Sequence, residues 1–254
     1  MADSVQILLE DADLLAVNKP AGMLTIPDRQ GAESLRELLA RQKQVLLNFR
    51  ERTHEGKTGL RIVHRLDRET SGVLVLAKHV AAQRELSGQF FRREVEKSYL
   101  AIVRGSPAED EGLVDAPLAP DPRTPGRMRV RTKSGKRSQT RWTVVERFRG
   151  ISLLRCRPLT GRQHQIRVHM AHAGMPLLVD PLYGSAEAFF LSSVKRGYRR
   201  GLDQEERPLI ARLTLHAESL RFVHPTSGEP VCVEAPPPKD FRATLAQLRK
   251  TCAP

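Results

Sequence analysis

Short apolar runs of strand length, separated by turn residues, recur along most of this sequence and limit the folds it can adopt. The run at 73–77 is a continuous Val-Leu-Val-Leu-Ala, which is typical of a buried strand. Asp11 and Asp13 separate two earlier runs, 5–9 and 14–17, and this spacing predicts a β-hairpin. Because strands dominate and many connections have hairpin length, the pattern indicates an α+β fold and not a regular βαβ alternation.

The other elements are predicted from apolar spacing and turn chemistry. Leucines at broadly helical spacing predict a helix over 34–49. Further helices are expected at 81–93, 161–173 and 241–249, and further strands at 97–103, 142–148, 151–157, 212–222 and 231–234. The segment 107–125 is rich in Pro, Asp and Gly and is expected to be a surface connection, and 189–208 reads as a charged insertion. We expect one domain over residues 1–254.

The net charge of the chain restricts its partners. It is +13 at pH 7, with an isoelectric point of about 10.3, and a folded protein this basic usually has a polyanionic partner. Nucleic acid is the first candidate and an anionic membrane surface the second. No apolar run approaches the ~20 residues that span a bilayer, and the first residues show no signal-peptide pattern. We therefore expect a cytoplasmic protein without membrane contact.

A basic stretch of one sign runs from Arg123 to Arg141, with eight Lys or Arg residues and no acidic one. The Ser-Gly pair at 134–135 predicts a basic hairpin or loop there. A charge run is often only a solvated face, but the length and single sign of this one favour RNA contact. Its candidate RNA-binding residues are Arg129, Arg131, Lys133 and Lys136. A second basic cluster lies at 195–200.

Several kinds of site lack support in the sequence. The three cysteines are far apart and form no CxxC pair, so neither a disulfide framework nor a thiolate zinc site is indicated. There is no GxxxxGK[ST] loop, no GxGxxG segment and no GxSxG elbow, so nucleotide-, dinucleotide- and hydrolase-type functions are not favoured. We expect no cofactor and no metal.

Asp67 is a candidate for chemistry because it lies between Arg65 and Arg68. Flanking positive charge keeps a carboxyl group ionised, which suits a nucleophile on a tight loop. The Thr-Ser-Gly turn at 70–72 makes an ordinary turn-capping role equally compatible with the pattern. Both interpretations remain open from these residues alone.

Two other segments carry residues that could serve in chemistry. His169 and His172 are three residues apart and could share a metal, but no third ligand has convincing spacing. Phosphate contact or hydrogen bonding within the core is the more ordinary role for such histidines. Tyr99 stands alone in a predicted strand, where a tyrosine is usually a packing residue.

Taken together, these segments resemble the RluA family of pseudouridine synthases. The matching segments are 15–22, 64–72, 97–99, 160–169, 180–184 and 215–217, in the family's order. The resemblance extends from about residue 5 to residue 240. It implies the pseudouridine-synthase catalytic fold, an α+β fold with a mixed, mostly antiparallel sheet flanked by helices and loops.

The resemblance also implies roles for individual residues. Asp67 matches the catalytic aspartate, which acts as nucleophile. Tyr99 matches the tyrosine that stacks on the target uracil and is a candidate general base, and Arg167 matches the arginine that pairs with the aspartate. Arg65 matches the arginine that enters the RNA where the target base leaves. The remaining candidate RNA-binding residues of the matching segments are Lys19, Arg162, His164 and Gln165.

The implied reaction isomerises a uridine in place, within a structured RNA such as a stem-loop of rRNA or tRNA. It needs no cofactor, because no group donor and no redox change is involved. The target base leaves the RNA stack at a cost of a few kcal/mol. The pattern contains one carboxylate, whereas glycosidases that hydrolyse use two. We expect an enzyme that acts as a monomer.

The sequence departs from the family pattern at two points. Val179 stands where the family usually has Gly, and no S4-type domain is expected because the pattern begins within the first ten or so residues.

Two rival functions have clear signatures. A non-catalytic RNA-binding protein would bind RNA without isomerising it, and a metal-dependent nuclease would use His169, His172 and Asp180.

Overall fold

The structure is a computed structural model in which the chain forms two compact units. It describes residues 5–27, 34–42, 59–184, 186–195, 197–198 and 205–253. The first unit comprises Met1–Lys97 and Ala217–Pro236, and the second Ser98–His216 and Pro237–Pro254. The boundaries fall inside strands β5 (Glu96–Arg104) and β11 (Leu215–Val223), so each of these strands contributes residues to both units.

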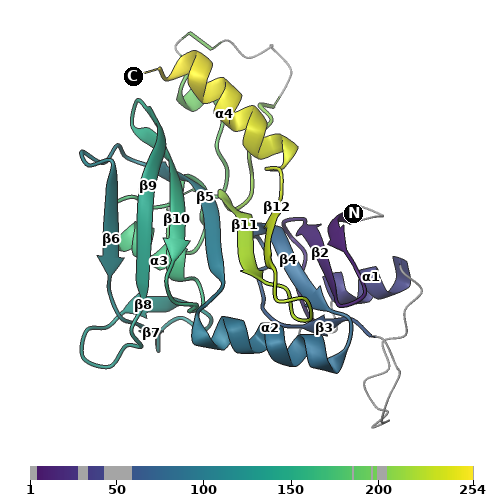
Figure 1. Ribbon diagram of the computed structural model, residues 1–254. Coiled ribbons are helices and arrows are strands. Elements are labelled where there is room, and N and C mark those ends of the chain that lie inside the picture. The colour runs from purple at the N-terminus through teal and green to yellow at the C-terminus, as the bar shows by residue number, and fades with distance from the viewer. Residues whose placement is uncertain are drawn as a thin grey trace. The chain divides into compact units, whose positions relative to one another are not determined.

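The first unit is built on antiparallel hairpins (Figure 1). Strand β1 (Gln6–Glu10) pairs with β2 (Leu14–Lys19), which pairs with β4 (Ser71–Ala77). Beyond β4 lies β11, which pairs with β12 (Pro230–Glu234), and the short β3 (Arg61–Ile62) also pairs with β4. The helices of this unit are α1 (Leu35–Gln42) and α2 (Val80–Arg92).

The core of the first unit lies between its strands and α2. Every residue of β4 is buried, as its continuous apolar run predicts. Alternate residues of β2 and β4, such as Leu14 and Val75, pack against Ala82 and Leu86 of α2. Because successive side chains of a strand point to opposite faces, this alternation holds α2 on one side of the strands.

The second unit contains the antiparallel series β5–β10–β9–β6 (Figure 1). Its further strands are β6 (Glu111–Asp115), β7 (Leu118–Pro120), β8 (Met128–Val130), β9 (Gln139–Phe148) and β10 (Ile151–Pro158). Strands β7 and β8 form a separate two-stranded sheet. The helices are α3 (Gln165–His172), the 3₁₀ turn η1 (Leu191–Ser193) and α4 (Lys239–Thr251).

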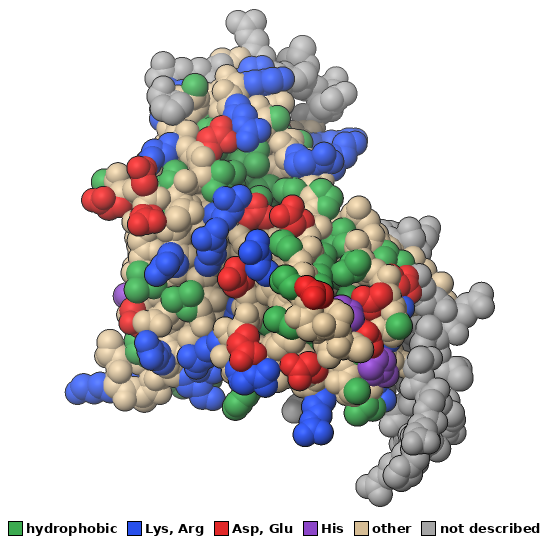
Figure 2. All heavy atoms as spheres, viewed as in Figure 1, with side chains coloured by type: hydrophobic (Ala, Val, Ile, Leu, Met, Phe, Trp, Pro, Cys, Tyr) green, Lys and Arg blue, Asp and Glu red, His purple; other side chains and the backbone are tan. Residues whose placement is uncertain are grey.

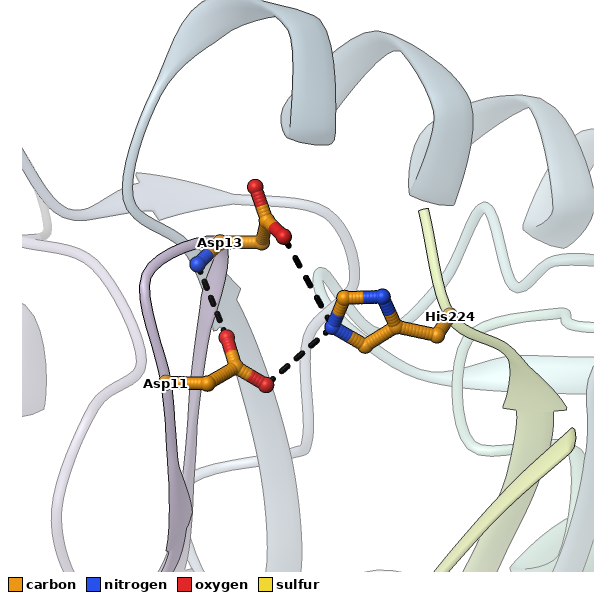
Figure 3. A group of neighbouring side chains, drawn as sticks. All are labelled: Asp11, Asp13 and His224. Carbon is orange, nitrogen blue, oxygen red and sulfur yellow. Dashed lines mark hydrogen bonds and ion pairs between the residues drawn. The ribbon is translucent and has the colours of Figure 1, made fainter. Parts of the chain in front are cut away.

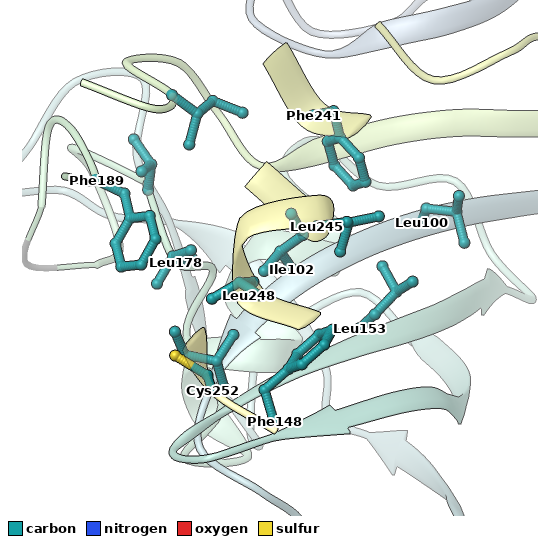
Figure 4. Packing of buried hydrophobic residues seen from close by; sticks show 13 residues of the cluster. Leu100, Ile102, Phe148, Leu153, Leu178, Phe189, Phe241, Leu245, Leu248 and Cys252 are labelled. Atoms are coloured by element: carbon teal, nitrogen blue, oxygen red, sulfur yellow. The ribbon is translucent and has the colours of Figure 1, made fainter. Parts of the chain in front are cut away.

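Helix α4 closes one core of the second unit. Figure 4 shows Phe241, Leu245 and Leu248 of this helix packed with apolar side chains of the strands, among them Ile102 and Leu153. Burying large apolar side chains from a helix and a sheet in one cluster is what stabilises an α+β unit.

The expected α+β class with mostly antiparallel pairing is confirmed. Two local predictions are wrong. The segment 107–125 is not only a connection, because it contains β6 and β7. The helix expected at 161–173 begins only at Gln165, because His164 has a left-handed backbone (φ 54°) that cannot continue a helix backwards. The predicted helix 34–49 is described as α1 as far as Gln42, and its remainder lies outside the described residues.

We predict that Gly72→Ala destabilises the first unit severely. Gly72 has φ +116°, and a Cβ there would lie 2.1 Å from the backbone oxygen of Ala217, which cannot move aside. The expected loss is above ~3 kcal/mol of unfolding free energy. Gly150→Ala is the control, since its φ is +71° with open space around it, and should cost only about 1 kcal/mol. Equal losses in urea denaturation would contradict the steric argument.

Candidate active site

Asp67 occupies a tight turn directly before the buried strand β4. The Thr70 N–H donates to the Asp67 carbonyl oxygen at 3.1 Å, which closes the turn. The Asp67 side chain is half-buried, and the neighbouring Arg65 is exposed. The turn therefore places Asp67 next to a rigid, fully buried strand.

A buried ammonium group ties this turn to the segment that follows β2. Lys19 is fully buried, and its Nζ donates to the carbonyl oxygens of Pro20 (2.9 Å), Met23 (2.6 Å) and Arg68 (2.9 Å). Three carbonyl acceptors match the three donors of an ammonium, which satisfies the buried charge. The expectation that Lys19 contacts RNA finds no support in this geometry, because burial removes the ammonium from the surface. Its position fits the ordering of the Asp67 turn.

Further bonds fix the same turn from both sides. Thr25 Oγ1 donates to the Leu66 carbonyl oxygen at 3.1 Å, next to Asp67. The N–H of Gly22 donates to the Arg68 carbonyl oxygen at 2.9 Å, and Arg68 Nε donates back to the Gly22 carbonyl oxygen at 3.0 Å. The backbone on each side of Asp67 is therefore bonded to the 20–25 segment.

In the second unit, the Arg167 guanidinium makes a buried bidentate pair with Asp180. Arg167 Nε and Nη2 lie 2.8 and 2.7 Å from Oδ2 and Oδ1 of Asp180, and both side chains are buried. The same Oδ1 accepts the N–H groups of Leu182 and Tyr183 at 2.9 and 3.1 Å. Two parallel hydrogen bonds fix the plane of the guanidinium as well as its position.

Tyr183 connects Arg167 to the basic segment around β8. The Arg167 guanidinium carbon lies 5.0 Å from the centre of the Tyr183 ring, and that of Arg127 lies 5.5 Å from it. The Met128 N–H donates to the Tyr183 hydroxyl oxygen at 2.7 Å, and that hydroxyl lies 2.8 Å from His164 Nδ1. Burial raises the pKa of Tyr183, so its hydroxyl stays protonated.

The side chain of Gln165, in the 160–169 segment, is hydrogen-bonded entirely within the protein. Gln165 Oε1 accepts from the Thr160 hydroxyl and the Arg162 N–H, and its Nε2 donates to Gln139 and Thr140. All four bonds of a side-chain amide are thereby used inside the protein. The expectation that Gln165 binds RNA is therefore unsupported, and we assign it a structural role.

His169 is likewise a core residue. Its Nδ1 lies 2.8 Å from Thr140 Oγ1 and its Nε2 lies 2.9 Å from the Ala116 carbonyl oxygen. Burial lowers the pKa of His169, which favours the neutral ring. With both ring nitrogens bonded, His169 offers no lone pair to a metal. Because the carboxylate of Asp180 is bonded to Arg167, two of the three ligands of the nuclease interpretation, His169 and Asp180, are bonded to protein groups.

Tyr99 lies in β5 opposite Cys156 of β10, and it packs partly buried against a hydrophobic cluster of the second unit. This position matches the packing role that a lone strand tyrosine suggests, and the residue as a whole is half-buried.

The basic stretch forms the hairpin and loop that its sequence predicts. Arg129 lies in β8, and Arg131, Lys133 and Lys136 lie exposed in the loop that follows. Arg129 Nη1 is 3.8 Å from Asp121 Oδ1, while its Nε is buried without a hydrogen-bond partner among the described residues. Figure 2 shows Lys and Arg side chains spread among Asp and Glu side chains on the face drawn.

The basic stretch 123–141, called the basic loop from here on, is anchored to the segment that leads into α3. Gln163 Nε2 donates to the Gly126 carbonyl oxygen, and Arg162 Nε to that of Arg137, both at 3.4 Å. Together with the Tyr183–Met128 bond, these contacts join the basic loop to the helix that carries Arg167. Of the second cluster, 195–200, only Lys195, Gly197 and Tyr198 are described.

One group of described residues has side chains close enough to share a metal, namely Asp11, Asp13 and His224. Figure 3 shows both carboxylates directed at His224 Nε2, which lies 3.1 Å from Asp11 Oδ2 and 3.7 Å from Asp13 Oδ2. His224 Nδ1 accepts the Ser227 N–H at 3.1 Å, so in the neutral ring Nε2 carries the proton. A metal would need a lone pair on that nitrogen. The group therefore fits an ion network that joins the β1–β2 turn to the end of β11.

Comparisons with known proteins show the family to which the chain belongs. A family model described as RNA pseudouridylate synthase matches residues 13–172. The ribosomal large subunit pseudouridine synthase D of Xanthomonas campestris is 39% identical over 98% of this chain and 71% of its own length. The ribosomal large subunit pseudouridine synthase C of Escherichia coli is 38% identical over 96% of this chain and 70% of its own.

Solved structures agree as well. Human RNA Pseudouridylate Synthase Domain Containing 1 has a TM-score of 0.70 and 27% identity, over 100% of this chain and 98% of that one. Human RNA Pseudouridylate Synthase Domain Containing 4 has a TM-score of 0.69 and 25% identity, over 96% and 93% of the two chains.

The chain belongs to the RNA pseudouridine synthase family, and the resemblance to the RluA family is confirmed. It is an isomerase that converts uridine in RNA to pseudouridine. None of the helices described is long and apolar enough to cross a membrane.

The family resemblance implies no role for two residues that organise the second unit, and Asp180 entered only as a metal ligand of the nuclease alternative. Asp180 holds the Arg167 guanidinium, and Tyr183 links it to the basic loop. Both lie in the matching segment 180–184, so that segment was the available signal. Sequence spacing could not reveal their partners, because the Arg167–Asp180 pair is a tertiary contact.

We predict that Asp180→Asn destabilises the second unit by about 3 kcal/mol, because it removes the buried negative charge that binds the Arg167 guanidinium through two hydrogen bonds. Glu146→Gln is the matched control. Glu146 also pairs with an arginine, Arg249, through two oxygens, but that pair is exposed and its loss should cost under about 1 kcal/mol. Urea denaturation of the two variants measures the difference. Similar losses would show that burial does not set the strength of the Arg167 pair.

Proposed function

We propose that this enzyme modifies specific uridines in stem-loops of ribosomal RNA, with Asp67 as the catalytic nucleophile. The observation that carries the assignment of Asp67 is its turn, which is bonded on both sides to the 20–25 segment and held by the buried Lys19. The ribosomal substrate is supported by the names of relatives from Xanthomonas campestris and Escherichia coli. We propose that the enzyme acts in the cytoplasm as a monomer, and a stem-loop of tRNA is the alternative substrate.

In the proposed mechanism, the glycosidic C–N bond of the uridine breaks, the base turns, and its C5 bonds to the same ribose carbon. Asp67 supplies the nucleophilic carboxylate. Tyr99 stacks on the flipped uracil, which offsets part of the cost of unstacking, and Arg65 fills the gap that the base leaves. The partial burial of Tyr99 and the exposure of Arg65 are compatible with these roles.

We propose that Arg167 acts on the same uridine as Asp67. Its guanidinium is fixed by Asp180 and by the Tyr183 ring, so its charge is preorganised. The pairing of Arg167 with Asp67 stays a prediction. Loss of that pairing in Arg167→Met should lower the rate of pseudouridine formation far more than it weakens RNA binding, as measured by single-turnover kinetics and by RNA affinity.

We predict that Asp67→Asn abolishes pseudouridine formation and leaves RNA affinity nearly unchanged, because Asn keeps the shape and loses the nucleophilic charge. Pseudouridine mapping in total RNA from cells with the wild-type gene, the Asn variant or no gene identifies the uridine and tests the residue together. We expect one pseudouridine that is present in RNA from wild-type cells and absent from cells with the Asn variant or with no gene. Near wild-type modification by the Asn variant would exclude Asp67 as nucleophile, and a mapped tRNA site would replace the ribosomal assignment.

We predict that RNA binding depends on the loop after β8. Replacing Arg129, Arg131, Lys133 and Lys136 by Ala should raise KM and reduce the salt dependence of binding, because each phosphate contact contributes about −0.7 to −0.9 to the log–log salt slope. Single-turnover isomerisation at saturating RNA should be nearly intact. An unchanged salt slope in the quadruple variant would remove this loop from the RNA-binding surface.

A further inference from the structure

The end of helix α2 gathers three hydrogen-bond donors on the first unit. They are His64, whose ring stacks on Phe90 of the helix and which lies three residues before Asp67, Arg93, which caps the helix, and Lys97, which follows in β5. We call these three residues the α2 corner. Neither the candidate roles discussed above nor the basic loop of the second unit includes them.

Arg93 has an unfavourable backbone. Its φ is +64°, in the left-handed region where glycine is usual, and its N–H and that of Glu94 donate to the Phe90 and Gln89 carbonyl oxygens as a helix cap requires. A non-glycine residue in this conformation costs stability. The exposed guanidinium has no ion pair among the described residues, so nothing in the fold itself explains why the position carries an arginine.

Lys97 is a half-buried cation without a counter-ion. No carboxylate lies in salt-bridge distance of its ammonium within the described residues, and the acid nearest Arg93 in sequence, Glu94, is bound to Arg92 Nε at 2.8 Å. Burial, and then the charge of Arg93, lower the pKa of Lys97. A partly desolvated cation next to a second cation gains strongly from an added anion.

His64 contributes a donor of fixed direction. Its Nε2 accepts the Val75 N–H at 3.0 Å, so the proton of the neutral ring is on Nδ1. The ring stacks on Phe90, with 4.5 Å between ring centres and 19° between ring planes, which prevents it from turning. Burial and the charge of Lys97 lower the pKa of His64 to about 3, so the ring stays neutral. No described residue accepts from Nδ1.

We propose that the α2 corner binds a backbone phosphate of the substrate RNA, close in sequence to the nucleophile Asp67. The three side chains offer donors only, which suits an anion with several acceptor oxygens. The assignment to RNA rests on the proposed function. It is favoured over a free anion by Phe91, which is 88% exposed, adjoins the corner in sequence and offers a stacking face to a base. Arg65, also exposed, adjoins His64.

The sharpest test is Arg93→Gly, because this change should preserve or raise the stability of the fold while it weakens RNA binding. Glycine relieves the left-handed backbone, so the thermal midpoint should stay equal or rise. Loss of the phosphate contact should weaken binding of a hairpin RNA carrying the mapped uridine by about tenfold and lower the magnitude of the salt slope by about 0.7 to 0.9. The control is Arg84→Gln, an exposed arginine on the same helix, which should change binding far less.

Neutral methylphosphonate groups, placed one at a time along the hairpin, locate the phosphate. One position should weaken binding to the wild type and have no further effect in Lys97→Gln or Arg93→Gly. The proposal is overturned if every position behaves alike in wild type and variants, or if Arg93→Gly keeps wild-type affinity. It is also overturned if the variants lose binding of inorganic phosphate but not of RNA, which would assign the corner to a free anion.

These outcomes are separable from failure of the proposed function. Binding is measured in the Asp67→Asn background, so it needs no turnover. If the wild type forms no pseudouridine in the hairpin, the proposed function fails whatever the binding data show. If it forms pseudouridine normally and Arg93→Gly binds as the wild type does, only the phosphate site fails.

Discussion

The buried ammonium group of Lys19 is the interaction on which the Asp67 turn depends. An unpaired charge inside a protein is costly, so this lysine is tolerable only where its three donors meet three carbonyl oxygens. One of those oxygens belongs to Arg68, directly after Asp67. Any movement of the turn would break that bond and leave the buried charge less satisfied. The bonds that satisfy buried Lys19 therefore keep the backbone at the proposed nucleophile rigid.

The second unit also satisfies a buried cation, but with a carboxylate in place of carbonyl oxygens. The buried guanidinium of Arg167 is satisfied by Asp180, whose carboxylate also accepts two backbone N–H groups. The ring of Tyr183 covers the pair, and its hydroxyl accepts from the backbone of β8. The helix with Arg167 and the basic loop thus share one hydrogen-bonded network.

Some cations of this protein are bonded to groups inside the fold, and others are placed where a polyanion can contact them. Lys19 is satisfied by three carbonyl oxygens of its own unit, and the Arg167 guanidinium is held by Asp180. Arg131, Lys133 and Lys136 are exposed, and Lys97 is half-buried without a counter-ion among the described residues. A net charge of +13 in the sequence cannot distinguish these groups, since burial and partners decide what each charge does.

The sequence alone determined the fold class, the family and most strand positions, because apolar periodicity and turn residues are local signals and the matching segments are distinctive. It failed for β6 and β7, whose polar, proline-containing segment forms strands only because β9 and β8 pair with them. It also named Lys19 and Gln165 as candidate RNA-binding residues, and their polar character could not reveal that both side chains are buried and hydrogen-bonded inside the protein. Only the tertiary structure decided that these two side chains hold the fold, that Asp180 and Tyr183 position Arg167, and that His64, Arg93 and Lys97 lack acidic partners among the described residues. Hydrogen-bond partners and desolvation depend on residues distant in the chain, and that dependence appears only when the chain is folded.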